Sequence, residues 1–207
     1  MSFQDIYISM QEGFSAMTWR ELIAVIFGLA SVWYSKQENI LVYPTGLVST
    51  LIYVWICLEV GLYADMGINA YYFVMSIYGW YAWTRPTASG TSPKITWNSL
   101  NENILSITIL LISYAILYWV LSNYTDSDVP YWDSFTTASA FVGMWLMAKK
   151  KVENWIAWII TDLVSVPLYA YKNLWLTSFQ FLVFTGLAIW GLDAWIKSAR
   201  QANTNHA

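Results

Sequence analysis

The chain has 207 residues, of which 57% are hydrophobic and only 11% are charged, whereas soluble domains carry about 25% charged residues. With a mean hydropathy of +0.44, this composition indicates an integral membrane protein that has no large soluble domain. A net charge of −3 argues against a nucleic-acid partner, and the single Cys57 and single His206 exclude a disulfide framework, a Cys- or His-based metal site and a His-dependent triad, so neither a metal nor another cofactor is expected.

The predicted elements begin with a short interfacial helix within residues 1–17, where apolar and polar groups alternate. A membrane span needs ~20 residues, and the apolar segments that follow predict seven spans. Thr18 and Glu21 have the spacing of a capping box at the start of the first span. The spans are expected at about Thr18 to Tyr34, Asn39 to Val60 (interrupted by Pro44 and Gly46), Met66 to Trp83, Asn101 to Asn123, Tyr131 to Ala148, Val152 to Tyr171 and Trp175 to Ile196.

Lys and Arg residues are distributed unevenly over the two sides that these spans define. The side of the N-terminus carries two, Arg20 and Lys172. The opposite side carries the other eight, namely Lys36, Arg85, Lys94, Lys149, Lys150, Lys151, Lys197 and Arg200. Because basic residues concentrate in cytoplasmic loops, we expect an outside N-terminus, a cytoplasmic C-terminus and an odd number of spans.

An internal repeat relates the two halves of the chain. The stretch from Tyr78 to Arg85 matches that from Trp190 to Lys197, and with small gaps Glu38-Asn39 matches Glu153-Asn154. Two such three-helix units joined by one helix must be parallel, a 3+1+3 plan in which the substrate path lies between the units. The expected divisions are an interfacial segment at 1–17, a first unit at 18–84, a loop and linker helix at 85–130, a second unit at 131–197 and a polar tail at 198–207.

The span from Val152 to Tyr171 carries polar and aromatic groups on one helical face: Trp155, Trp158, Asp162, Ser165 and Tyr169. A carboxylate near the bilayer midplane is costly, so Asp162 either binds a ligand or is satisfied by hydroxyls that hold helices together. The tryptophan pair suits stacking on a flat, cationic ring, although an aromatic belt is the alternative for Trp155. In this alignment Ile40, Tyr43 and Gly46 or Leu47 occupy the corresponding first-half positions.

Two further helices present polar faces. Asn69, Tyr72 and Ser76 recur at helical spacing before the loop at Thr84, and Thr177 and Gln180 do so in the last span. These amides either bond across helices or, together with Asp162 and the tryptophans, recognise a nucleoside-like ligand through stacking, amide pairing and hydroxyl contacts.

The quoted stretches resemble the PnuC family of bacterial nicotinamide riboside transporters over about residues 18 to 198. The most specific parts are the YYxxMSxYGW stretch near Tyr72, the WxxW at Trp155 and Trp158, and the following DxxSxPLY. The resemblance implies a SWEET-like fold, a trimer in the bacterial inner membrane, and facilitated diffusion that cytoplasmic phosphorylation makes one-way. It also implies that Trp155 and Trp158 bracket the nicotinamide and that Asp162, Gln180 and Asn69 are nearby polar contacts.

Other functions remain open from the residues alone. The same fold could carry thiamine, riboflavin or another flat vitamin, as members of the family do. An intramembrane enzyme could use Asp162 as an acid or base, but no second carboxylate at comparable depth accompanies it. A purely structural assembly protein is the third possibility. Whether transport is coupled to an ion gradient is undecided, since the sequence offers no chain of ionisable groups across the membrane.

Overall fold

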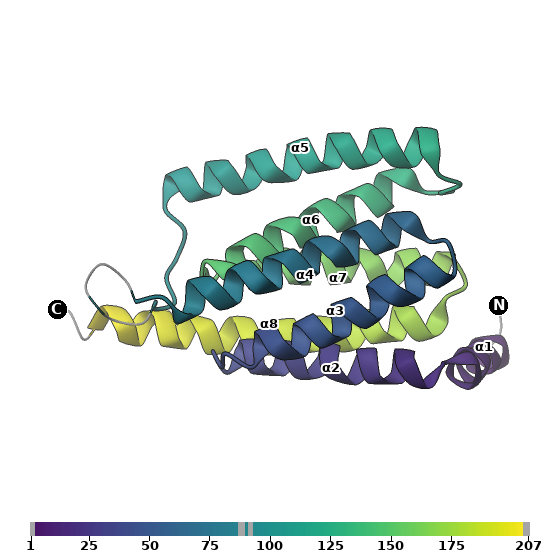
Figure 1. Ribbon diagram of the computed structural model, residues 1–207, viewed down its shortest axis with the longest axis horizontal. Coiled ribbons are helices and arrows are strands. Elements are labelled where there is room, and N and C mark those ends of the chain that lie inside the picture. Colours follow the sequence, from purple (N-terminus) through teal and green to yellow (C-terminus); the bar gives the residue numbers. More distant parts are fainter. Residues whose placement is uncertain (1–2, 87–89, 91–92, 205–207) are drawn as a thin grey trace.

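The computed structural model describes residues 3–86, 90 and 93–204, and this part of the chain is α-helical (Figure 1). Its helices are α1 (Phe3–Ala16), α2 (Trp19–Lys36), α3 (Val42–Glu59), α4 (Tyr63–Thr84), α5 (Leu100–Tyr124), α6 (Pro130–Ala148), α7 (Asn154–Tyr171) and α8 (Trp175–Thr204). Helix α1 lies across the end of the bundle, whereas the others run along it (Figure 1). Helix α1 and the last turns of α8 lie at opposite ends of the bundle (Figure 1).

Two capping boxes fix helix starts. The predicted box at α2 is confirmed: the Glu21 amide donates to the Thr18 hydroxyl at 3.2 Å, and the Thr18 amide donates to the Glu21 carboxylate at 2.7 Å. Ser99 and Glu102 form the same box at the start of α5. Each box satisfies two amides that have no partner inside the helix, and a cap of this kind typically stabilises a helix by ~1 kcal/mol.

Two predicted helix boundaries are wrong. The helix expected from Asn39 begins at Val42, after a turn in which the Leu41 amide donates to the Asn39 side chain at 3.0 Å. Pro44 therefore falls in the first turn of α3, where its missing N–H leaves no bond unmade, and the helix is not interrupted. At the other end of the chain, α8 continues past Ile196 to Thr204, because the polar tail is rich in residues that favour helix.

Six helices close into a ring through their neighbour contacts. Helix α2 packs on α3, α3 on α4, α4 on α6, α6 on α7, α7 on α8, and α8 back on α2. Within the described residues, no other pair of these six brings Cα atoms within 8 Å. Helix α5 packs on α6 alone and α1 on α8 alone, so both lie outside the ring (Figure 1). Side chains that face the centre of the ring can therefore come from helices that are not neighbours.

The ring contains the same contact twice. The Trp83 indole donates to the Met147 carbonyl at 3.2 Å, from α4 to α6, and the Trp195 indole donates to the Ser35 carbonyl at 2.9 Å, from α8 to α2. Each residue of the second contact is related to one of the first by a shift of 112 positions. Helices α2–α4, called the first unit below, and helices α6–α8, called the second unit, therefore meet through reciprocal hydrogen bonds.

The same shift relates the turns that precede α3 and α7. Glu38 and Lys150 both adopt the left-handed conformation, with φ of 55° and 54°. Their amides bond back to Ser35 and Met147 at 3.1 and 3.0 Å. The correspondence that we predicted for these helices is therefore wrong: Glu38 corresponds to Lys150, not to Glu153. Matching Glu-Asn letters misled the alignment, whereas turn conformation and hydrogen bonds fix it without gaps.

The helices differ in how apolar they are. Among the described residues, three helices are long and apolar enough to cross a membrane: α3, α5 and the Trp175–Gln201 part of α8. A bent pair, Gln4–Ala16 with Trp19–Lys36, forms a fourth candidate, with an angle of 104° between its two parts. Helices α4, α6 and α7 fall outside this group, and they carry many Tyr, Trp, Ser and Thr residues, which lower hydropathy.

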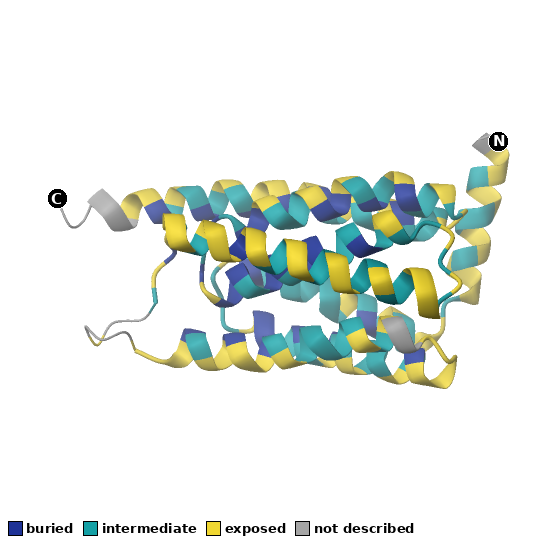
Figure 2. Cartoon of the chain, turned by 90° about the horizontal axis from the view of Figure 1, so that it is seen from above, coloured by how far each residue is buried: buried dark blue, intermediate teal, exposed yellow. Residues whose placement is uncertain are grey.

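The buried core lies at one end of the ring, the end of the C-terminus. It includes Val42, Tyr43, Trp83, Ile95, Met144, Met147, Val152, Trp155, Ala188, Trp195 and Ala199. Buried positions occupy the interior of the bundle and exposed positions cover its outside (Figure 2). The aromatic side chains of this buried cluster, Tyr43, Trp83, Trp155 and Trp195, therefore lie at this end of the ring.

The segment before α5 is attached to the second unit. The Thr96 amide donates to the Lys150 carbonyl, and the Val152 amide donates to the Thr96 carbonyl, both at 3.1 Å. Glu153 accepts from the Asn98 amide at 2.9 Å, and the turn before α7 also supplies Lys151, whose side chain pairs with a glutamate of α5 at 2.9 Å. Helix α5 is thus joined to α6 and to the turn that follows it.

Candidate functional site

The polar face predicted for the sixth span lies on α7 and is buried. The solvent-exposed fraction of the residue is 4% for Asp162, 1% for Ser165 and 4% for Thr161. The Thr161 hydroxyl is satisfied by the Ala157 carbonyl one turn earlier, at 2.9 Å. Asp162 and Ser165 thus remain as polar groups that α7 does not satisfy through its own backbone.

Trp158 reaches across the ring from α7. Its indole lies 6.4 Å from the Tyr72 ring of α4 between centroids, at an interplanar angle of 60°. The α4 and α7 backbones do not approach within 8 Å between Cα atoms in the described residues, so the two rings bridge the space between these helices. An aromatic ring held at van der Waals distance between two others needs a separation of ~7 Å. Because the two rings are inclined at 60°, a flat ligand would fit between them only if one ring also turned toward the plane of the other.

The Asp162 carboxylate receives no hydrogen bond or ion pair from any described residue. It lies one turn beyond Trp158 on the same face of α7. A buried carboxylate without a partner is costly, and a cationic ligand stacked on Trp158 would supply the missing charge. This arrangement of a π face beside an unpaired carboxylate suits a flat cation.

Trp155 lies in a different environment from Trp158. It is 2% exposed and packs at 90° on Trp195, with ring centroids 5.7 Å apart. A Cβ atom on Gly191 would lie 2.6 Å from its ring, so the indole fills the space over that glycine. Its N–H has no partner in the described part of the chain. The two tryptophans of the WxxW pair therefore face different surroundings, one the core and one the space between α4 and α7.

Tyr169, near the end of the α7 face, stacks on Phe181 of α8, with centroids 5.1 Å apart and an angle of 18°. Thr177 and Gln180 are partly buried on α8, beside this pair.

On α4, the Asn69 amide donates to the Asp65 carbonyl of its own helix at 2.9 Å. Ser76 is buried, and its hydroxyl faces Gly46 of α3, where an added Cβ would lie 3.5 Å away. The geometry thus joins Tyr72 to Trp158, whereas Ser76 faces α3 and Asn69 is bonded within α4.

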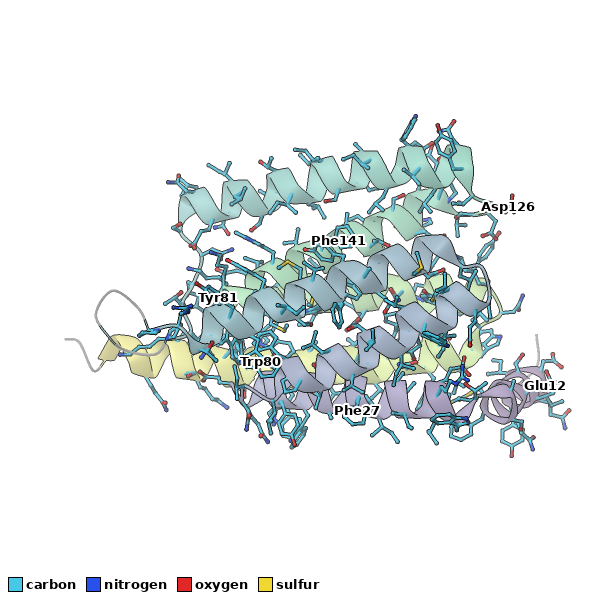
Figure 3. The ribbon with its side chains drawn as sticks, viewed as in Figure 1. Glu12, Phe27, Trp80, Tyr81, Asp126 and Phe141 are labelled. Atoms are coloured by element: carbon cyan, nitrogen blue, oxygen red, sulfur yellow. The ribbon has the colours of Figure 1, made fainter. Side chains whose placement is uncertain are left out.

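The two ends of the ring differ in their charged contacts. At the end where α7 finishes, Lys172 pairs with Asp133 at 2.8 Å. Farther along the bundle, near the middle of α6, lies Phe141 (Figure 3). The Tyr71 hydroxyl of α4 donates to the Phe141 carbonyl at 3.1 Å, and the centroids of the two rings are 4.1 Å apart.

At the opposite end, Lys150 lies over the Trp83 ring, with its ammonium 4.4 Å from the centroid. Burial lowers the pKa of Lys150 from its ordinary value, and the charge of Glu38 opposes that shift. The Ser198 hydroxyl donates to Glu38 at 2.5 Å. This end is therefore held by charge as well as by packing.

Gly143 of α6 is a residue that the sequence-based site did not include. A Cβ atom at this position would lie 3.0 Å from Cε2 of Trp158 and 3.2 Å from Cδ2 and Nε1. The signal that could have found it is the ungapped shift of 112 positions, which aligns Gly143 with Ser31 and Trp158 with Gly46. The expected counterparts of the α7 face are corrected accordingly: Tyr43 corresponds to Trp155, and Gly46 to Trp158.

Comparisons with known proteins agree with this architecture. A family model described as nicotinamide mononucleotide transporter matches residues 18–197. The nicotinamide riboside transporter PnuC of Escherichia coli is 27% identical over 221 residues, covering 95% of this chain and 92% of that protein. The riboflavin/roseoflavin transporter RibM of Streptomyces davaonensis is 26% identical over 194 residues, covering 89% and 88%.

A solved structure is similar over almost the whole chain. The crystal structure of the vitamin B3 transporter PnuC superposes with a TM-score of 0.72 at 18% identity, covering 97% of this chain and 94% of that one. The likeness at this identity shows the fold.

Proposed function

The chain belongs to the nicotinamide mononucleotide transporter family and is a membrane transporter, and from that premise we propose that it carries nicotinamide riboside into the cytoplasm by facilitated diffusion. The observation that carries the proposal is the pairing of the Trp158 and Tyr72 rings beside the unpaired, buried Asp162. Nicotinamide riboside presents a flat pyridinium ring with a positive charge, which this combination of π face and carboxylate would recognise. We assign Ser165, on the same face of α7, and the partly buried Gln180 of α8 to its hydroxyls and amide.

We propose further that α2 to α8 each cross the membrane, in a 3+1+3 plan of two parallel units with α5 as the linker. The reciprocal bonds of Trp83 and Trp195 support this plan, because they recur after the same shift and join the units at both of their seams. The N-terminus would then be outside, and the end of the ring that holds the buried core of Tyr43, Trp83 and Trp195 would be cytoplasmic. In this plan the substrate path runs through the centre of the ring.

The mechanism follows from what lies along that path. The substrate enters from the outer end, stacks on Trp158 and neutralises Asp162. Release then requires the aromatic core at the cytoplasmic end, which includes Tyr43, Trp83 and Trp195, to open. In the proposed uniport neither ATP nor a coupled ion takes part, so net flux would follow the electrochemical gradient of the cation. A trimer in the bacterial inner membrane is the assembly that we propose by analogy with the family.

A binding titration of the purified full-length protein with nicotinamide riboside tests the site. We expect the wild type to bind and Trp158→Ala to raise the dissociation constant at least about tenfold, since an aromatic contact with a desolvated cation contributes ~2 kcal/mol. Trp119→Ala is the matched control, because Trp119 is exposed on α5 and far from the ring centre. Equal binding by Trp158→Ala and the wild type would overturn the site, and no binding by the wild type would overturn the substrate.

Riboflavin is the second candidate substrate, because the Streptomyces relative is named a riboflavin transporter at nearly the same identity. Its ring system is flat but uncharged, so it would not need Asp162. Competition of unlabelled riboflavin and thiamine against labelled nicotinamide riboside, in vesicles that contain the protein, separates these vitamins. Recovery of a chemically altered product in the same assay would instead indicate an enzyme.

A further inference from the structure

We propose that Gly143 is a positioning residue for substrate recognition: it sets the place of the Trp158 ring, and through that ring the affinity for a flat substrate. The inference rests on the proposed function, because it takes Trp158 as a residue that touches the substrate. Gly143 itself lies on α6, one helix away, and would act only through the indole.

The contact is close along the rigid part of the indole. A Cβ atom at Gly143 would lie 3.0 and 3.2 Å from Cε2 and Cδ2, the two atoms shared by the rings of Trp158, and 3.2 Å from the adjoining Nε1. Contacts this short require the neighbour to move by a few tenths of an ångström. A fused ring has no flexible end that could yield, so the whole indole would shift from its place opposite Tyr72. Alanine is therefore the smallest change that displaces the stacking surface.

The first unit has the same pair of positions with the sizes exchanged. Ser31 corresponds to Gly143 and Gly46 to Trp158, and a Cβ atom on Gly46 would lie 3.1 Å from the Ser31 hydroxyl. In the first unit, the Ser31 side chain of α2 thus faces a glycine of α3. In the second unit, the glycine is on α6 and the side chain that it faces, Trp158, is on α7. At this pair of positions, only the second unit therefore carries a large aromatic side chain.

Both units also contain another contact between a glycine and an aromatic ring, at corresponding positions. Gly79 faces the Tyr43 ring and Gly191 faces the Trp155 ring, and an added Cβ would come within 2.4 and 2.6 Å of them. These pairs occupy corresponding positions, so both units use a glycine to seat a ring of the core. The Gly143 contact lacks such a counterpart. It is therefore specific to the unit that carries Trp158 and Asp162.

A double-mutant cycle tests the proposal by titration with nicotinamide riboside. We expect Gly143→Ala to raise the dissociation constant roughly tenfold in the wild-type background, as misplacement of a positioning contact does. In a Trp158→Phe background the smaller ring leaves room for the methyl group, so the same change should have no further effect. Gly186→Ala is the matched control, because no atom lies within 4 Å of a Cβ at that helical glycine.

Thermal denaturation of the ligand-free variants tests the contact between Gly143 and Trp158 in the absence of substrate. Gly143→Ala should lower the melting temperature when Trp158 is present and leave it unchanged or raised when Phe replaces it. Equal effects of Gly143→Ala in both backgrounds, on melting or on affinity, would overturn the positioning role. Unchanged nicotinamide riboside affinity in Gly143→Ala, with binding abolished in Trp158→Ala, would overturn this inference alone. Failure of the wild type to bind would reject the proposed substrate, while the melting cycle would still decide the contact.

Discussion

We expect Asp162 to be the residue whose charge distinguishes between flat ligands. It is buried on α7 without a hydrogen bond or ion pair from the described residues. A cation on the Trp158 ring would be attracted by the carboxylate and by the π face together, whereas a neutral ring would gain only the stacking. Two ligands of the same shape but different charge therefore separate the two contributions.

We predict that Asp162→Asn weakens binding of nicotinamide riboside by about tenfold or more, corresponding to ~1.4 kcal/mol. The reduced, uncharged dihydronicotinamide riboside should bind the variant and the wild type equally. Titration with both ligands measures the difference. Asp193→Asn is the control, since Asp193 is exposed and pairs with Lys197 at 2.6 Å. An equal loss for both ligands would show that the carboxylate acts on the fold and not on the charge.

Residue types could be selected from the sequence, but their surroundings could not. The helical face with Trp155, Trp158 and Asp162 follows from spacing alone, and the structure has it on one helix. Spacing does not distinguish two tryptophans one turn apart, since that depends on which neighbours each one meets. Packing puts Trp155 against Trp195 and Trp158 against Tyr72, from helices distant in the chain.

At the scale of helices, the seams between the units are the most regular feature. Each seam has one buried tryptophan whose N–H reaches a carbonyl at the end of a helix in the other unit. The two bonds are equivalent under the shift of 112 positions, so the two tryptophans should contribute alike to stability. Each also packs against a ring of its own unit, Tyr43 or Trp155.

We predict that Trp83→Phe and Trp195→Phe lower the free energy of unfolding by similar amounts, about 2 to 4 kcal/mol, because each loses a buried hydrogen bond and leaves a cavity. Thermal denaturation in detergent measures both. Trp80→Phe should change little, since Trp80 is exposed on the same helix. A large loss for one tryptophan and none for the other would contradict the equivalence of the seams.

Helix positions were largely predictable, and helix register between the units was not. Hydropathy and the capping box place α2, α6 and α7 within a few residues of their observed bounds. The repeat alignment failed at Glu38, because a match of only two letters recurs by chance in a chain of this length. What the units share is conformation, such as the left-handed turns at Glu38 and Lys150, and a single sequence does not show it.

At the scale of the whole molecule, the topology is the property to test. We predict that a membrane-impermeant maleimide labels Asp126→Cys in intact cells and labels Lys149→Cys only after the cells are opened. Both positions are exposed, at opposite ends of the ring. The background is Cys57→Ser, which removes the single cysteine. Labelling of both variants in intact cells would contradict an outward α5–α6 loop with a cytoplasmic α6–α7 turn.

The attachment of the linker helix has a mechanical consequence. Helix α5 contacts α6 alone among the described helices, and the segment before it is bonded to the turn between α6 and α7. We therefore expect α5 to move together with α6–α8 rather than with α2–α4. If these two groups of helices rock against each other during transport, the covalent connection between them would contribute little to the forces that hold them together. A chain severed at Gly90 would keep every helix contact of both pieces, so we expect the connection to return the polypeptide to the other side of the bilayer rather than to hold the two groups together.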